Sequence, residues 1–120
     1  MKQTPIVFRV DQGDYHPVFC LKQITVSDDS NFLQRFIDLA DKEGDEKAEA
    51  MYRIKAEILA EWAAPFQGKK KPKEVLDSPE AIKEFFADAD VDKDWISEHA
   101  INALRSRHQP NVSFFSASQL

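Results

Sequence analysis

The sequence contains only one cysteine and three glycines among its 120 residues. A single Cys20 excludes an internal disulfide and fits a reducing compartment. So few glycines leave no glycine-rich loop to hold a nucleotide phosphate. No apolar run approaches the ~20 residues that a membrane span needs, and the first ten residues lack the apolar stretch of a signal peptide. These absences predict a cytoplasmic protein with no membrane partner.

Basic residues are outnumbered as well, with 16 lysines and arginines against 21 acidic side chains and a formal net charge of −5. Direct nucleic-acid binding is not expected, because neutralising phosphates requires clustered basic side chains. A lysine-rich stretch covers residues 69–73, but it has no interleaved aromatic side chain on which a base could stack. We interpret it as a solvated linker. The length of the chain suits one compact domain.

Residues 5–26 are predicted to form a β-hairpin. The run Ile6–Val10 is rich in β-branched and aromatic residues, and a polar turn follows at residues 11–14. The two strands are expected at residues 5–10 and 15–26. Pro17 cannot donate a hydrogen bond to a neighbouring strand, so it should lie at an edge or a bulge.

After the hairpin the spacing of apolar residues changes from two to about 3.6, which indicates helices. The predicted helices cover residues 29–43, 45–64, 78–90 and 92–108. Residues 27–30 offer N-cap candidates for the first helix, and Ser78 followed by Pro79 is a clear start signal for the third. The expected fold is α+β: a single domain over residues 1–110, in which the N-terminal hairpin packs against a bundle of about four helices. A tail follows at residues 111–120.

One acidic stretch has the spacing of a calcium loop. Acidic residues occupy every second position in it: Asp88, Asp90, Asp92 and Asp94. A calcium loop of this type also needs a glycine at its sixth position and a glutamate at its twelfth, where this chain has Lys93 and His99. We therefore interpret the stretch as a connection between two helices, whose aspartates cap the fourth helix. No metal site is predicted.

No group of residues assembles a catalytic mechanism. His16 and Cys20 lie four residues apart, which on one strand separates them by more than ~13 Å and prevents direct proton transfer. The chain has no His-Glu-x-x-His motif and no Gly-x-Ser-x-Gly motif. The sequence predicts a protein that is not an enzyme, with no catalytic residues and no cofactor.

Aromatic residues supply the candidate binding surface. We nominate the face of the second helix that carries Tyr52, Leu59 and Trp62, together with Phe114 and Phe115 in the tail. For Trp62, core packing is the alternative to exposure. For the phenylalanine pair, folding back onto the domain is the alternative to docking on a partner.

The order of elements resembles the small tail assembly chaperones of long-tailed bacteriophages. The residues that carry the resemblance are the apolar strand Ile6–Val10, the turn Asp11–Tyr15, the return strand Val18–Leu21 leading to Ile24–Val26, and the acidic helices between Phe32 and Ala64. The resemblance covers about the first half of the chain. It implies a protein of the host cytoplasm that binds the tape-measure or tail-tube protein before assembly, without catalysis.

A second function fits the acidic composition. Acidic side chains dominate two blocks, at residues 28–64 and 77–99. Such blocks suit a small acidic inhibitor or decoy that occupies a basic, nucleic-acid-binding surface of a partner, because complementary charge speeds association.

Overall fold

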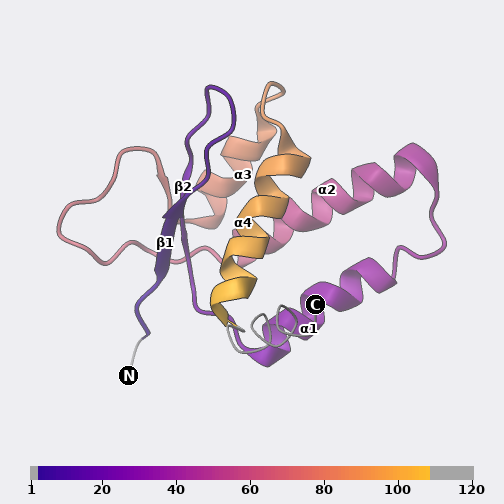
Figure 1. The fold of residues 1–120 in the computed structure, drawn as a ribbon, viewed down its shortest axis with the longest axis horizontal. Helices are drawn as coiled ribbons and strands as arrows, with labels where there is room; N and C mark the ends of the chain where they lie inside the picture. The colour runs from indigo at the N-terminus through magenta and orange to yellow at the C-terminus, as the bar shows by residue number, and fades with distance from the viewer. Residues whose placement is uncertain (1–2, 109–120) are drawn as a thin grey trace, which may run out of the picture.

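The computed structural model describes residues 3–108 and has an α+β fold (Figure 1), which confirms the predicted class. The elements are β1 (Ile6–Arg9), β2 (Val18–Leu21), α1 (Val26–Ile37), α2 (Gly44–Glu61), β3 (Val75–Leu76), α3 (Pro79–Ala87) and α4 (Lys93–His108). In Figure 1 the helices lie on one side of the β1–β2 hairpin, and the long connection after α2 loops out on the other side. The small sheet and the helices share one hydrophobic core.

The sheet has the strand order β1–β2–β3, so β2 is the central strand. β1 and β2 form the predicted antiparallel hairpin, with Phe8 opposite Phe19. β3 pairs with β2 in parallel, with Val18 opposite Val75. β3 is not among the predicted elements, because two residues show no alternation and their partner strand lies far earlier in the chain.

The two strands of the hairpin are shorter than the predicted span of residues 5–26. Gln12 and Tyr15 close the turn between them through paired backbone hydrogen bonds of 2.9 Å, with Gly13 at a positive φ of 57°. Pro17 precedes β2, and its carbonyl accepts a hydrogen bond from the backbone N–H of Val10 at 3.0 Å. Only the carbonyl of Pro17 is used, so its missing N–H removes no bond from the sheet.

α1 begins three residues before the predicted start and ends at Ile37, well before the predicted residue 43. Its N-cap is Thr25, not one of residues 27–30. The Thr25 side chain accepts a hydrogen bond from the N–H of Asp28 at 3.1 Å, and the N–H of Thr25 donates to the Asp28 carboxylate at 2.8 Å. This reciprocal pair is a capping box, which sets the start of the helix more strongly than a single serine could.

α2 ends at Glu61, three residues before its predicted end, because the chain then returns to the sheet. The carbonyl of Trp62 accepts a hydrogen bond from the N–H of Lys22 at 2.8 Å, and the N–H of Ala64 donates to the carbonyl of Cys20 at 2.9 Å. Through these bonds the segment after α2 pairs with the end of β2, on the edge of β2 that also pairs with β3. The lysines of the predicted linker that follows are exposed.

Of the four predicted helices, α4 matches the sequence prediction most closely. α3 and α4 each begin one residue after the predicted starts of 78–90 and 92–108. α3 ends earlier than expected, at Ala87. The hydroxyl of Ser78 accepts a hydrogen bond from the N–H of Ala81 at 3.1 Å, which confirms the predicted N-cap.

Aromatic rings join the hairpin to α3. Phe19 has no exposed surface, and its ring stacks on Phe8 of β1 at 5.9 Å and on Phe86 of α3 at 6.3 Å between centroids. Phe85 meets the same ring edge-on at 6.4 Å. An isolated hairpin is marginal in water, so this hairpin depends on the apolar area that it buries against α3.

Two ion pairs fix α4 against the other helices. Lys55 of α2 donates a hydrogen bond to Asp94 at the start of α4 at 2.7 Å. Arg105, near the end of α4, pairs with Asp29 of α1 at 2.6 Å. Lys55 and Asp29 are both buried, which charged side chains tolerate only when they are paired. The two pairs thus attach α4 to α2 at one end and to α1 near the other.

Candidate functional site

The face of α2 that the sequence nominated for binding is divided between core and surface. Leu59 is 0% exposed and Trp62 is 3% exposed, so neither can contact a partner in this conformation. The Trp62 ring lies against Phe32 of α1, with 5.8 Å between centroids. Core packing, the alternative considered for Trp62, is therefore the observed state, because burying both side chains removes a large apolar area from water. Phe114 and Phe115 lie outside the described residues.

Tyr52, the third nominated residue of α2, has a different environment. It is half-buried and lines a groove of about 300 Å³ between α2, α3 and the start of α4. Half-buried Ala56 and buried Phe86 line the same groove. The groove thus presents apolar surface on which a partner side chain could pack, and Tyr52 places an aromatic ring within it.

Charged side chains also line this groove, which we call the Tyr52 groove. Glu49 and Arg53 pair with each other at 3.4 Å. Lys83 and Lys93, by contrast, form no ion pair with any of residues 3–108. An apolar centre with charged residues around it is the usual anatomy of a protein interface. No local pattern in the sequence indicates this groove, because its residues come from three separate helices.

A second groove, of about 510 Å³, lies between the hairpin turn, the segment before β3 and α3. Its acidic lining residues are Asp14, Glu74, Glu84 and Asp88. Tyr15 also lines it, and its hydroxyl donates a hydrogen bond to Asp88 at 3.2 Å. Burial raises the pKa of Tyr15, and the negative charge of Asp88 raises it further, so the phenol stays neutral at physiological pH. We call this the acidic groove.

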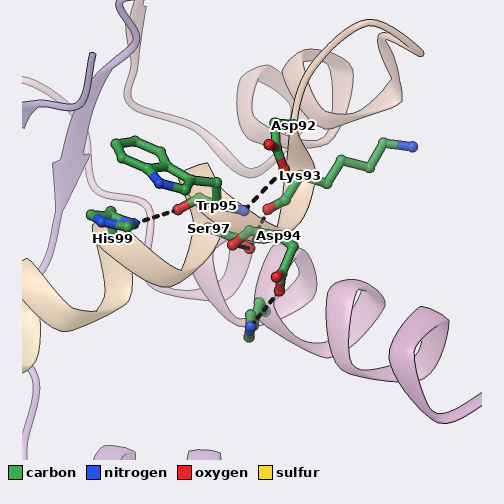
Figure 2. Close-up of polar contacts among 7 residues, drawn as sticks. Asp92, Lys93, Asp94, Trp95, Ser97 and His99 are labelled. Carbon is green, nitrogen blue, oxygen red and sulfur yellow. Dashed lines mark hydrogen bonds and ion pairs between the residues drawn. The ribbon is translucent and has the colours of Figure 1, made fainter. Parts of the chain in front are cut away.

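Figure 2 shows that two aspartates of the acidic stretch, Asp92 and Asp94, form contacts at the start of α4. Asp92 accepts a hydrogen bond from the N–H of Trp95 at 3.2 Å, and Asp94 is held by Lys55. Asp88 accepts from the N–H of Asp90 at 2.9 Å. The interpretation as a connection between two helices is confirmed, but only one of the four aspartates, Asp92, caps α4. Within residues 3–108, no group of three or more His, Cys, Asp and Glu side chains could hold a metal ion.

Trp95, near the start of α4, is partly exposed, with 37% of its surface accessible to solvent. Its ring stacks on His99 one turn later, with 3.7 Å between centroids, as Figure 2 shows. The spacing of four residues could have indicated this pair, since such residues are neighbours on a helix surface.

The structure separates the two residues considered as a nucleophile pair. His16 is exposed, and its Nδ1 lies 2.7 Å from the Asp11 carboxylate. Cys20 is fully buried in β2. Burial raises the pKa of the Cys20 thiol, so the thiol remains protonated at neutral pH.

The chain matches no family model, no curated protein and no solved structure. The resemblance to tail assembly chaperones therefore stays a prediction. None of the helices within residues 3–108 is both long and apolar enough to cross a membrane.

Proposed function

We propose that the chain is a non-enzymatic protein-binding module, and that it serves as a tail assembly chaperone for the tape-measure or tail-tube protein of a bacteriophage. The observation that supports protein binding is the Tyr52 groove, where a half-buried aromatic ring lies beside apolar surface and two lysines that form no ion pair within residues 3–108. Tyrosine is among the residues that contribute most to binding at protein interfaces. The more specific chaperone role rests on the resemblance of the N-terminal half. We propose a cytoplasmic location on the same basis.

A second candidate function is the acidic decoy. The acidic groove favours it, because Asp14, Glu74 and Glu84 form no ion pair with any of residues 3–108. Their charge is available to a basic surface of a partner. Binding of that kind would be fast and sensitive to salt.

Salt dependence and groove variants distinguish the two functions. The measurement is the affinity of the purified chain for the tape-measure and tail-tube proteins encoded in the same genome, at 0.1 M and 1 M salt. The Debye length falls from about 10 Å to about 3 Å over this range, whereas burial of apolar area is not screened. For the chaperone we expect binding that survives 1 M salt, weakens at least tenfold in Tyr52→Ala and persists in Tyr52→Phe.

Variants of the acidic groove test the decoy function. Asp14→Asn with Glu84→Gln removes two charges there, and Asp41→Asn with Glu43→Gln removes two exposed charges elsewhere as a matched control. Affinity that collapses with salt, ignores Tyr52→Ala and falls only in the first double variant would overturn the chaperone function in favour of the decoy. Thermal melts of all variants check that each remains folded.

A further inference from the structure

α1 carries a stripe of apolar side chains that no other described element covers. Val26, Leu33 and Ile37 are 71%, 41% and 63% exposed. At 3.6 residues per turn, these three positions lie within about 40° of one another around the helix axis. An amphipathic helix normally turns its apolar residues toward the core. We call this surface the α1 stripe.

The stripe borders the side of α1 that faces α4. Around the helix axis, Asp29 lies between the buried Phe32 and the stripe, since successive residues are separated by about 100°. Asp29 pairs with Arg105 of α4 at 2.6 Å. Arg35, on the opposite flank of α1, pairs instead with Glu61 of α2 at 2.8 Å. α4 therefore approaches α1 next to the stripe, and α2 approaches on the other flank.

The chain leaves α4 at this place. Arg105 lies one turn before the last residue of α4, and Figure 1 shows the end of α4 beside the N-terminal part of α1. From Gln109, the six residues that end at Phe114 could span up to about 20 Å if extended. The stripe from Val26 to Ile37 is about 16 Å long. The extended segment is therefore longer than the stripe, and it starts on the side of α1 where Arg105 meets Asp29.

The segment that follows α4 has a composition that suits an apolar surface. Residues 109–120 contain no charged side chain, and they include the adjacent Phe114 and Phe115. A second copy of the chain is a weaker occupant, because a face about 16 Å by 10 Å is on the order of 160 Å². Stable interfaces bury about 800 Å² on each partner.

We propose that residues 109–120 dock on the α1 stripe of the same chain, with Phe114 and Phe115 packed against Leu33 and Ile37. The segment shields apolar surface of α1 from water. A partner that binds α1 must first displace it, so the segment is an intramolecular competitor for that surface. The proposal does not depend on the proposed function, and its test requires no partner.

The test compares methyl NMR spectra of the full chain and two matched variants. Phe114→Ser with Phe115→Ser removes both rings, and Ser116→Ala with Ser118→Ala alters the same segment but keeps the rings. We expect the methyl signals of Leu33 and Ile37 to shift in the first variant only. The signals of Val7, exposed on β1, should not move. The shifts should be independent of protein concentration over a tenfold range.

Two results would overturn the proposal. Unchanged Leu33 and Ile37 signals in the phenylalanine variant would show that the segment does not cover the stripe. Shifts that appear only at high protein concentration would assign the stripe to a second copy. A spin label on Ser116→Cys gives an independent reading, since the native Cys20 is buried and escapes labelling. The label should broaden Leu33 and Ile37 more than Val7, and equal broadening would contradict docking.

Discussion

Cys20 and His16 are the two residues that the sequence suggested as a nucleophile pair, and their environments in the structure differ completely. Cys20 has no exposed surface, and burial raises its pKa; Asp77 raises it further, while Lys71 partly offsets both effects. His16 is exposed and engaged with Asp11. Because the thiolate is the reactive form of cysteine, a protonated and buried thiol reacts slowly. Cys20 is therefore expected to behave as a small apolar side chain of the core.

We expect native Cys20 to resist a thiol-specific reagent at pH 8 and to react fully once the chain is unfolded in denaturant. His16→Ala should leave the native labelling rate unchanged, because His16 does not activate the thiol. The rate is followed by absorbance or mass spectrometry, with a free-cysteine peptide as the control. Rapid labelling of the folded chain, or a slower rate in His16→Ala, would contradict this environment for Cys20.

The role of a single residue also depends on its neighbours, as a comparison of Tyr52, Leu59 and Trp62 shows. All three belong to the apolar side of one helix in the sequence. Leu59 and Trp62 are covered by the rest of the core, whereas Tyr52 lies where α2 extends along the groove beside α3 and α4. Helical spacing gives the direction of a side chain, but not whether another element covers it.

The capping box determines the start of α1, which is the element that the sequence placed least accurately. Burial raises the pKa of Asp28, but hydrogen bonds from the N–H of Thr25 and from Lys22 lower it more, so the folded pKa lies below the ordinary value. A depressed carboxyl pKa stabilises the fold above the unfolded value of about 3.9. That contribution is lost as the pH falls below about 4 toward the folded pKa.

We expect Thr25→Ala to lower the free energy of unfolding by about 1 kcal/mol at pH 7, as the loss of an N-cap does. Ser27→Ala is the matched control. It should be nearly neutral, because Ser27 was only a candidate cap and lies within the helix. Asp28→Asn should also lower the free energy of unfolding at pH 7, and its difference from the native chain should become smaller below about pH 4. Urea denaturation at pH 7 and pH 3 measures these values, and a constant Asp28→Asn deficit would contradict the sign of the pKa shift.

At the scale of the whole molecule, the Phe19 ring connects the sheet to α3. Phe19 contacts Phe8 within the sheet and both Phe85 and Phe86 in α3. Large-to-small changes at such fully buried aromatic positions leave a cavity and usually cost about 3–5 kcal/mol. Domains have only about 5–15 kcal/mol of total stability. The hairpin is thus expected to be part of the cooperative unit and not an appendage.

Phe19→Ala should lower the free energy of unfolding by about 3–5 kcal/mol and keep a single cooperative transition. Val7→Ala, in the strand paired with β2, should cost far less, because Val7 is 40% exposed. Urea denaturation followed by circular dichroism and tryptophan fluorescence provides the comparison. Similar losses for the two variants would show that the hairpin contributes little to the core.

The sequence by itself determined the α+β class, the hairpin and the four helices, and it located the start of α3 at Ser78. These features carry local signals: alternation, helical spacing and capping residues act between positions a few residues apart. The capped connection from Asp88 to Asp94 was predictable for the same reason. The existence of α1 was also predictable. Its exact start was not, because Thr25 and Asp28 form the cap together and several nearby serines and aspartates were equally good candidates.

Only the tertiary structure decided the pairing of β3 with β2, the burial of Leu59 and Trp62, and the two grooves. Each of these depends on segments distant in sequence. Val75 pairs with Val18, although α1 and α2 lie between them in the sequence. The Tyr52 groove combines residues of α2, α3 and α4. Burial and hydrogen bonding between remote segments follow from packing the whole chain around one core, and no local pattern of residues encodes them.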